Sequence, residues 1–352
     1  MMDDKKKSSS IQHPSSNIGR AAAWGITDGG AGMVAQVKAL ATALDIKPEM
    51  KKIVVRAPWA WLPNIFYATK LRSLMMPYFI SPASDSLAPP YPDLIISCGR
   101  RAAMVAMGLR EHIEQHRLPK TPYFIHILDP YVNAKYFDLL IAMEHDRLAP
   151  APKLITTRFA LHAITPKILD EARQHFALRF AAYPKPLIAV LLGGSTNKYS
   201  LSNNAMKGVI ASLKRLLAQT QGSLLITSSR RTGEKNTAML RQAFADSGRV
   251  YIYDFVEKNP YLGMLALADT IIVTNDSVNM MSEACATGKP VYLLPLAGHI
   301  YTRPARFAAQ LLRDGIARPL GGKLEKWGYK VENEMGRLAE EIKQRLACHP
   351  RA

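Results

Sequence analysis

Short apolar segments alternate with helical patterns along both halves of this chain, and this alternation restricts the fold more than any other feature. The clearest apolar segment is LIAVLL at 187–192, which runs directly into a glycine-rich loop. A helical pattern follows at 203–219, a second apolar segment at 223–227, and another helical pattern from Glu234. Strands that alternate with helices in this way form parallel sheets covered by helices. The second half is therefore predicted to be a doubly wound α/β domain.

The first half repeats the pattern. An apolar segment at 21–26 leads through a glycine turn into a helix, in which apolar residues recur at helical spacing. Further strands are expected at 51–56, 93–98, 122–128, 137–143 and 153–157. A length of 352 residues favours two domains over one. We therefore expect two Rossmann-like domains that face a cleft.

The boundaries follow from changes in composition. Residues 176–186 contain two prolines and are expected to be a linker. We assign the units in chain order as a disordered polar tail at 1–17, an N-terminal acceptor-side domain at 18–180, a C-terminal nucleotide-binding domain at 187–320, and a helical segment at 321–352 that packs back on the N-terminal domain.

Composition and motifs argue against several classes of protein. No run of 18 or more uncharged apolar residues occurs, so no membrane-spanning helix is expected. The lysines near the start precede no apolar region, which argues against a secretory signal. The three cysteines are widely spaced and no His-Glu-x-x-His motif occurs, so we expect neither a disulfide framework nor a metal site. These features favour a reducing, cytoplasmic setting.

The net charge of +18 is the strongest signal in the composition. Such a protein attracts nucleic acid, anionic lipid or phosphorylated substrates. A generally basic soluble protein would carry the same charge, so the charge alone does not decide between them. No nucleic-acid recognition motif occurs, and we expect no nucleic-acid partner.

Four loops are predicted at the edge of the sheets where ligands bind, beyond the carboxyl ends of the strands. Each is expected to begin a helix, where free backbone N–H groups and the helix dipole favour an anion. The loops are Asp28-Gly29-Gly30-Ala31-Gly32, Gly193-Gly194-Ser195-Thr196-Asn197, Ser228-Ser229-Arg230-Arg231-Thr232 and Thr274-Asn275-Asp276-Ser277.

The loop at 193–197 is the sharpest of the four. Its glycines would let the backbone approach a phosphate closely, and Ser195 and Thr196 add hydroxyl groups. It is neither G-x-G-x-x-G nor a P-loop, so dinucleotide and ATP binding lack support. The alternative is a tight turn between a strand and a helix.

The loop at 228–232 combines hydroxyl groups with Arg230 and Arg231, and arginine pairs with phosphate through two parallel hydrogen bonds. It would be a solvated surface loop if it has no ligand. Its predicted position coincides with that of the loop at 193–197, which favours a shared phosphate site.

The remaining candidates are carboxylates. Glu283 lies on the helix after the fourth loop, where a carboxylate can accept hydrogen bonds from two ribose hydroxyls. Asp276 and Ser277 would also suit helix N-capping. Asp28 could be a general base, or could cap the following helix.

Residues 58–79 mix aromatic and basic side chains. Trp59, Trp61, Lys70 and Arg72 could enter an anionic membrane interface, which would point to a lipid-linked acceptor and to attachment at the inner face of the cytoplasmic membrane. An ordinary buried helix is the alternative.

Segment 274–290 resembles the donor-site signature of GT-B glycosyltransferases. The pattern is most similar to that of the peptidoglycan N-acetylglucosaminyl transferases, and Ser282-Glu283 matches their Ser-Glu pair. The resemblance implies that Glu283 holds the ribose, and that the glycine loop at 193–197 is the phosphate loop of the second domain.

From Trp24 to about Leu320 the chain resembles the mitochondrial-fission family of the elongated-mitochondria type. The residues that carry this resemblance are Asp28, Gly29, Gly32 and Gln36 in the first motif, Gly193, Gly194, Ser195 and Asn197 in the second, segment 227–232 in the third, and segments 274–277, 283 and 288–290 in the fourth. Where members often have Asn-Gln in the first helix, this chain has Ala35-Gln36, which would remove one polar contact.

Two functions follow from these resemblances. The first is a metal-independent, inverting glycosyltransferase that needs no cofactor besides its substrate, a nucleotide-diphosphate sugar, and that acts on a lipid-linked or envelope acceptor. The second is a membrane-associated adaptor that kept the fold without catalysis.

Overall fold

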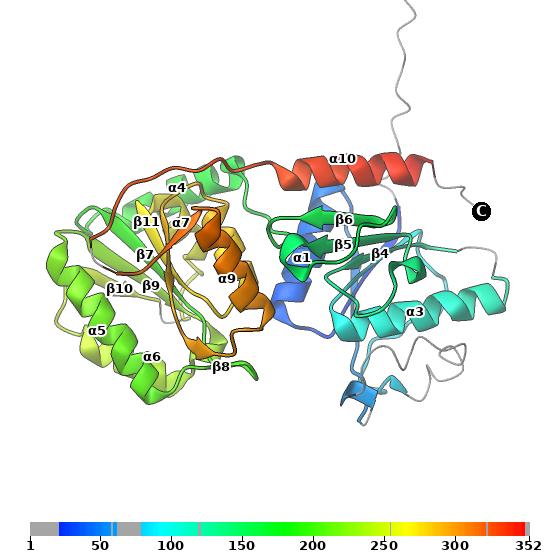
Figure 1. Ribbon diagram of the computed structural model, residues 1–352, viewed down its shortest axis with the longest axis horizontal. Coiled ribbons are helices and arrows are strands. Elements are labelled where there is room, and N and C mark those ends of the chain that lie inside the picture. The colour runs from blue at the N-terminus through cyan, green and yellow to red at the C-terminus, as the bar shows by residue number, and fades with distance from the viewer. Residues whose placement is uncertain are drawn as a thin grey trace, which may run out of the picture.

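The computed structural model describes residues 21–57, 59–61, 79–118, 121–253, 255–321 and 323–348. Within these residues the chain forms two six-stranded parallel sheets, each covered by helices (Figure 1). The strand orders are β2-β1-β3-β4-β5-β6 and β10-β9-β7-β11-β12-β14. The expected pair of doubly wound α/β domains is confirmed.

The first sheet has the apolar character that a sheet buried on both faces requires. All residues of β1, β3, β4 and β5 are buried. Its elements are β1 (Ala23–Thr27), α1 (Ala31–Ala43), β2 (Glu49–Lys52), η2 (Trp59–Trp61), β3 (Leu94–Cys98), α3 (Arg100–Gln115), β4 (Tyr123–Ile127), η4 (Ala134–Tyr136), β5 (Leu139–Met143), η5 (Glu144–Asp146) and β6 (Leu154–Thr157).

The strand expected at 51–56 lies earlier, at Glu49–Lys52, where it pairs with β1. Ile53 and Val55 are buried beyond the end of the strand, and Val55 bridges to Ile80. The apolar residues Ile53 and Val55 therefore indicate a buried segment. The backbone pairing with β1 begins at Glu49, two residues before the expected start of the strand.

The elements expected from residue 187 to the helix that starts at Glu234 occur in the predicted order along the chain, and α5 has the predicted bounds. The elements of the second domain are β7 (Leu187–Leu192), β8 (Tyr199–Ser200), α5 (Asn203–Gln219), β9 (Ser223–Ser228), η6 (Arg230–Thr232), α6 (Glu234–Ala243), β10 (Val250–Ile252), α7 (Tyr261–Leu267), β11 (Thr270–Thr274), α8 (Val278–Cys285), β12 (Val291–Leu294), β13 (Ala297–Gly298), α9 (Arg303–Arg313) and β14 (Ala317–Pro319). The short strands β8 and β13 pair with each other in a separate antiparallel sheet. The edge strand β14 was not predicted, because three residues carry too little periodicity.

The expected linker at 176–186 is wrong for its first five residues. Helix α4 (Pro166–Phe180) contains them and packs against α7. Phe176 and Phe180 lie in one core cluster with Leu187 and Ile271 of the second sheet. The helix therefore belongs to the second domain, although we expected the first domain to extend to residue 180.

After β14 the chain crosses back to the first domain, where α10 (Glu334–Ala347) lies (Figure 1). Leu338, Ala339 and Ile342 of this helix are buried in one cluster with Leu40 of α1. Glu334 accepts hydrogen bonds from the backbone N–H groups of Arg158 and Phe159. No helix in the described ranges is long and apolar enough to cross a membrane.

Candidate functional site

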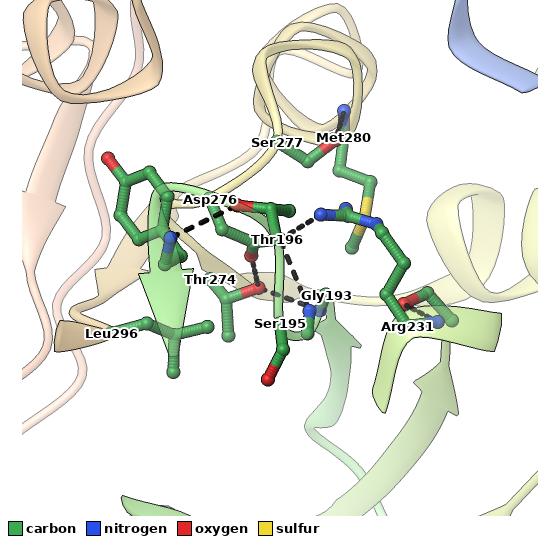
Figure 2. A network of polar contacts seen from close by, with 12 residues as sticks. Gly193, Ser195, Thr196, Arg231, Thr274, Asp276, Ser277, Met280 and Leu296 are labelled. Carbon is green, nitrogen blue, oxygen red and sulfur yellow. Dashed lines mark hydrogen bonds and ion pairs between the residues drawn. The ribbon is translucent and has the colours of Figure 1, made fainter. Parts of the chain in front are cut away.

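Three loops of the second domain meet at Asp276, after the carboxyl ends of β7, β9 and β11 (Figure 2). The Asp276 side chain is fully buried. It accepts hydrogen bonds from Thr274 Oγ1 at 2.7 Å and from the Gly194 backbone N–H at 3.2 Å, and pairs with Arg231 Nη1 at 2.8 Å. Thr274 Oγ1 in turn accepts from the Gly193 N–H at 2.8 Å. The sequence pattern had predicted this convergence of loops.

The glycines allow the loops to pack against one another. A Cβ atom on Gly193 would overlap with the Asp276 carboxylate, and one on Gly194 would overlap with the backbone of Arg231. The loop leads into β8, and α5 begins only at Asn203. The expectation that this loop starts a helix directly is therefore wrong, because β8 lies between the two.

Two side chains of this loop accept hydrogen bonds from backbone N–H groups just after the loop. Ser195 Oγ accepts the Leu201 N–H, and Thr196 Oγ1 accepts the N–H groups of Lys198 and Tyr199. Ser195, Thr196 and Asn197 are nevertheless exposed on the edge of the sheet.

The arginine loop folds into η6. Ser229 and Thr232 form a capping box, and Thr232 Oγ1 donates to the carbonyl of Gly193 at 2.5 Å. This arrangement joins the β9 loop to the β7 loop. Arg231 is held by Asp276, whereas Arg230 is exposed. Arg230 is thus the more available cation for an anionic ligand.

At the fourth loop, Ser277 caps α8 and accepts the Met280 N–H, while Asp276 plays a different part as the link between loops. The Asn275 side chain accepts the Leu296 N–H. Glu283 lies further along α8, and its carboxylate accepts a hydrogen bond from the Tyr261 hydroxyl at 2.5 Å. Burial raises the pKa of Glu283, and the hydroxyl of Tyr261 partly opposes that rise.

The first domain presents its own edge to this region. Asp28 Oδ1 accepts the Gly30 N–H, and Asp28 Oδ2 lies 3.5 Å from Arg101 Nη1. Gly30 occupies the N-cap position of α1 without a side-chain cap, so Asp28 shapes the turn before the helix. Gly29 has a φ of 85°, which disfavours a side chain.

The motif on α1 contacts the second domain. Gln36 Nε2 donates to Asn279 Oδ1 of α8 at 3.2 Å. A Cβ on Gly32 would overlap with the Asn279 side chain. Both motif residues thus touch the N-terminal part of the helix that starts at the fourth loop, and Ala35 is exposed.

Sequence reasoning missed an ion-pair cluster between the domains. Arg303 of α9 reaches two acidic residues of the first domain, Asp129 at 3.2 Å and Asp146 at 2.9 Å, and its guanidinium lies over the Tyr131 ring. Asp129 follows the strand expected at 122–128, so the sequence indicates that it lies at the edge of the sheet. The sequence does not indicate its partner, because Arg303 lies 174 residues away.

The buried histidine of β4 leads to a prediction about pH. His126 is fully buried, its Nδ1 lies 2.8 Å from Ser97 Oγ, and burial and Arg303 lower its pKa to about 3. Between pH 6.5 and about 3 the unfolded chain binds a proton at His126 that the folded chain does not bind. The free energy of unfolding therefore falls as the pH falls. His126→Gln is expected to lower the dependence of the free energy of unfolding on pH by about 1.1 kcal/mol per pH unit, measured by urea unfolding between pH 6.5 and 5.

The control for this experiment is His175→Gln, because His175 is exposed on α4. Equal slopes for wild type and His126→Gln would contradict the prediction, whatever the effect of the substitution on stability at pH 7.

The aromatic–basic segment is described only in part. Trp59 and Trp61 form η2, which lies beside the start of α3, since Arg100 donates to the carbonyl of Ala60. Trp61 is 76% exposed. Lys70 and Arg72 lie outside the described residues.

The chain is similar to known proteins over most of its length. The sequence profile of the family described as Mitochondrial fission ELM1 matches residues 31–346. A mitochondrial fission protein ELM1 of Arabidopsis thaliana is 31% identical over 73% of the chain, which spans 64% of the plant protein. An uncharacterized protein of Rickettsia prowazekii is 29% identical over 72% of the chain and 79% of its own length.

Comparison of folds agrees with the topology. A candidate UDP-N-acetylglucosamine 2-epimerase from Listeria monocytogenes has a TM-score of 0.51 at 10% identity, over 94% of this chain and 91% of that one. With two facing six-stranded parallel sheets, the chain has the GT-B type of fold. The match over residues 31–346 shows that the chain belongs to the Mitochondrial fission ELM1 family.

Proposed function

We propose that the chain is a metal-independent, inverting glycosyltransferase that binds a nucleotide-diphosphate sugar at the edge of the second sheet. One observation carries the proposal: three loops, each following a parallel strand, converge on Asp276. Ligands of open α/β sheets bind at this edge. The GT-B type of fold supports use of a nucleotide sugar.

The groups at this edge fit the parts of such a donor. Arg230 and the N–H groups at the start of α8 would meet the diphosphate, in place of a metal ion. Ser195, Thr196 and Asn197 would line the phosphate side of the site. Glu283 would accept from the ribose hydroxyls through the part of its carboxylate that Tyr261 leaves available.

The transfer step needs a base from the first domain, and Asp28 is our candidate. The acceptor hydroxyl would give its proton to the Asp28 carboxylate, its oxygen would bond to the anomeric carbon, and the bond from that carbon to the diphosphate would break. The nucleoside diphosphate would leave with its charge compensated by Arg230. Displacement from the opposite face inverts the anomeric configuration.

A nucleotide-sugar screen tests donor binding. Thermal unfolding in the presence of UDP, GDP, CMP and ADP sugars is expected to show one family of donors that stabilises the chain by about 2.7 kcal/mol at 100 times its Kd. Arg230→Ala and Glu283→Ala should each remove most of that shift. The control is Arg241→Ala, an exposed residue at the end of α6.

The acceptor is proposed to be lipid-linked, with the protein in the cytoplasm or at the inner face of the membrane. The exposed Trp61 supports a membrane contact, since indole rings favour that interface. Sedimentation with vesicles containing phosphatidylglycerol is expected to retain wild type at low salt and to lose much of Trp61→Ser. Equal sedimentation of both would place the contact elsewhere, and no sedimentation of either would argue against a membrane.

A second candidate is a non-catalytic adaptor. It is favoured because the carboxylates of the site already have partners: Asp276 holds Arg231, Tyr261 engages Glu283, and Arg101 lies beside Asp28. The fission role named for the plant relative also fits an adaptor. A screen in which no nucleotide sugar shifts the unfolding temperature would favour this candidate over the enzyme.

A further inference from the structure

The geometry points to a separate phosphate-binding site at the seam between the two domains. A cavity of 280 Å³ lies between η5 of the first domain and α9 of the second. Three arginines line it, and they come from both domains: Arg147 directly follows η5, while Arg306 and Arg313 lie on α9. None of the three belongs to the loops assigned to the nucleotide sugar, so this inference does not rest on the proposed function.

The charge of the cavity is positive. Arg306 and Arg313 are seven residues apart on one helix, which places them on the same face two turns apart. Glu144 is the acidic residue among those lining the cavity, and it accepts a hydrogen bond from Gln310 at 2.8 Å. His145 adds no charge at neutral pH, because burial and the nearby arginines lower its pKa to about 4.

The guanidinium groups are only partly engaged. Arg147 and Arg313 are exposed, and their side chains form no hydrogen bond or ion pair with a residue in the described ranges. Arg306 lies 3.9 Å from Asp146, and its buried Nε has no partner among the described groups. Like charges gathered in this way repel one another, and an anion placed between them would relieve the repulsion while accepting several charged hydrogen bonds.

The size of the cavity restricts the ligand. Pockets for whole organic ligands hold about 300–1,000 Å³, so a volume of 280 Å³ suits a phosphate or diphosphate group better than an entire nucleotide sugar. A phosphate bound here would contact Arg147 from one domain and Arg306 and Arg313 from the other. It would therefore join the domains at a point where Arg303 already pairs with Asp146.

The chemistry is shared by a soluble phosphate compound and by a lipid headgroup, and two arms of one experiment separate these sources. In the first arm, pyrophosphate is titrated calorimetrically at fixed ionic strength into the full chain carrying Arg230→Gln, a substitution that weakens competition from the proposed nucleotide-sugar site. Arg147→Gln and Arg313→Gln are each expected to weaken binding about tenfold. The matched control is Arg241→Gln, which removes the same charge from an exposed helical position outside the cavity.

In the second arm, the same chains are sedimented with vesicles of phosphatidylcholine alone or mixed with phosphatidylglycerol. If Arg147→Gln and Arg313→Gln bind pyrophosphate more weakly but sediment with vesicles as before, the ligand is a soluble phosphate compound. If the two variants lose both pyrophosphate binding and sedimentation, the ligand is a lipid headgroup. The unfolding temperature without anion checks that the variants fold. Arg147→Gln and Arg313→Gln chains that behave like Arg241→Gln in both arms would overturn the inference.

Discussion

Gly194→Ala is expected to destabilise the second domain by about 3 kcal/mol or more. The new Cβ would overlap with the backbone carbon and oxygen of Arg231 and with the Thr232 nitrogen. Overpacking against side chains costs about 1–3 kcal/mol, and here the obstacle is backbone that Ser229 and Thr232 fix by a capping box. Separation of the loops would also break the Gly194–Asp276 hydrogen bond. The unfolding temperature of the second domain should fall by roughly 6–12 °C.

Gly208→Ala is the matched control, because it makes the same chemical change in the same domain. Gly208 lies exposed in the middle of α5, and a Cβ there would meet open space. Alanine in a helix interior is favoured over glycine by about 0.5–1 kcal/mol, so this variant should be slightly more stable than wild type. Gly194→Ala and Gly208→Ala with similar unfolding temperatures would mean that the β7 and η6 loops are not in contact.

The strands were predictable because each strand of a sheet that is buried on both faces is a continuous apolar segment. Such a segment can be recognised in the sequence without knowledge of its neighbours in the fold. LIAVLL at 187–192 is apolar at every position and became β7, with all six residues buried. The N-terminal boundary of the second domain was harder to predict. The segment before Pro184 resembles a linker in composition, yet Phe176 and Phe180 are core residues whose partners, such as Ile271, lie far along the chain.

The location of the site was predictable for a similar reason. Each loop follows a strand, and parallel strands bring their carboxyl ends to one edge, so the convergence of loops at 193–197, 228–232 and 274–277 follows from topology. The pairing within the site does not, since sequence does not say which cation Asp276 will hold. Arg230 and Arg231 are adjacent, and only the turn of η6 decides that Arg231 faces Asp276 while Arg230 is exposed.

The same limit explains why the contacts between the domains were missed. The Gln36–Asn279 hydrogen bond spans 243 residues, and Arg303 meets Asp146 only because α9 packs beside η5. Such contacts depend on the relative placement of two domains, about which local periodicity carries no information.

Asp276→Asn is expected to cost about 2–4 kcal/mol, because it removes the charge from a buried group that three loops share. The amide keeps the size of the carboxylate, but its NH₂ group must face the Gly194 N–H, the Thr274 hydroxyl or Arg231, all of which are donors to Asp276. Arg231 is 37% exposed and can turn to water, so the loss is smaller than for a fully buried pair.

A double-mutant cycle with Arg231→Gln, followed by urea unfolding of the second domain, assigns this loss to the ion pair. The Asp276–Arg231 pair should show a coupling of about 1–2 kcal/mol, whereas the exposed Asp170–Arg173 pair on α4 should show less than about 0.5 kcal/mol in the same cycle. Because Asp276 is the common acceptor of the β7 and η6 loops, the Asn variant should also lose its response to any donor sugar that stabilises wild type. A variant that kept both its stability and that response would show that the loops are ordered without the buried carboxylate, and the nucleotide site would then have to be built from α8 and Arg230 alone.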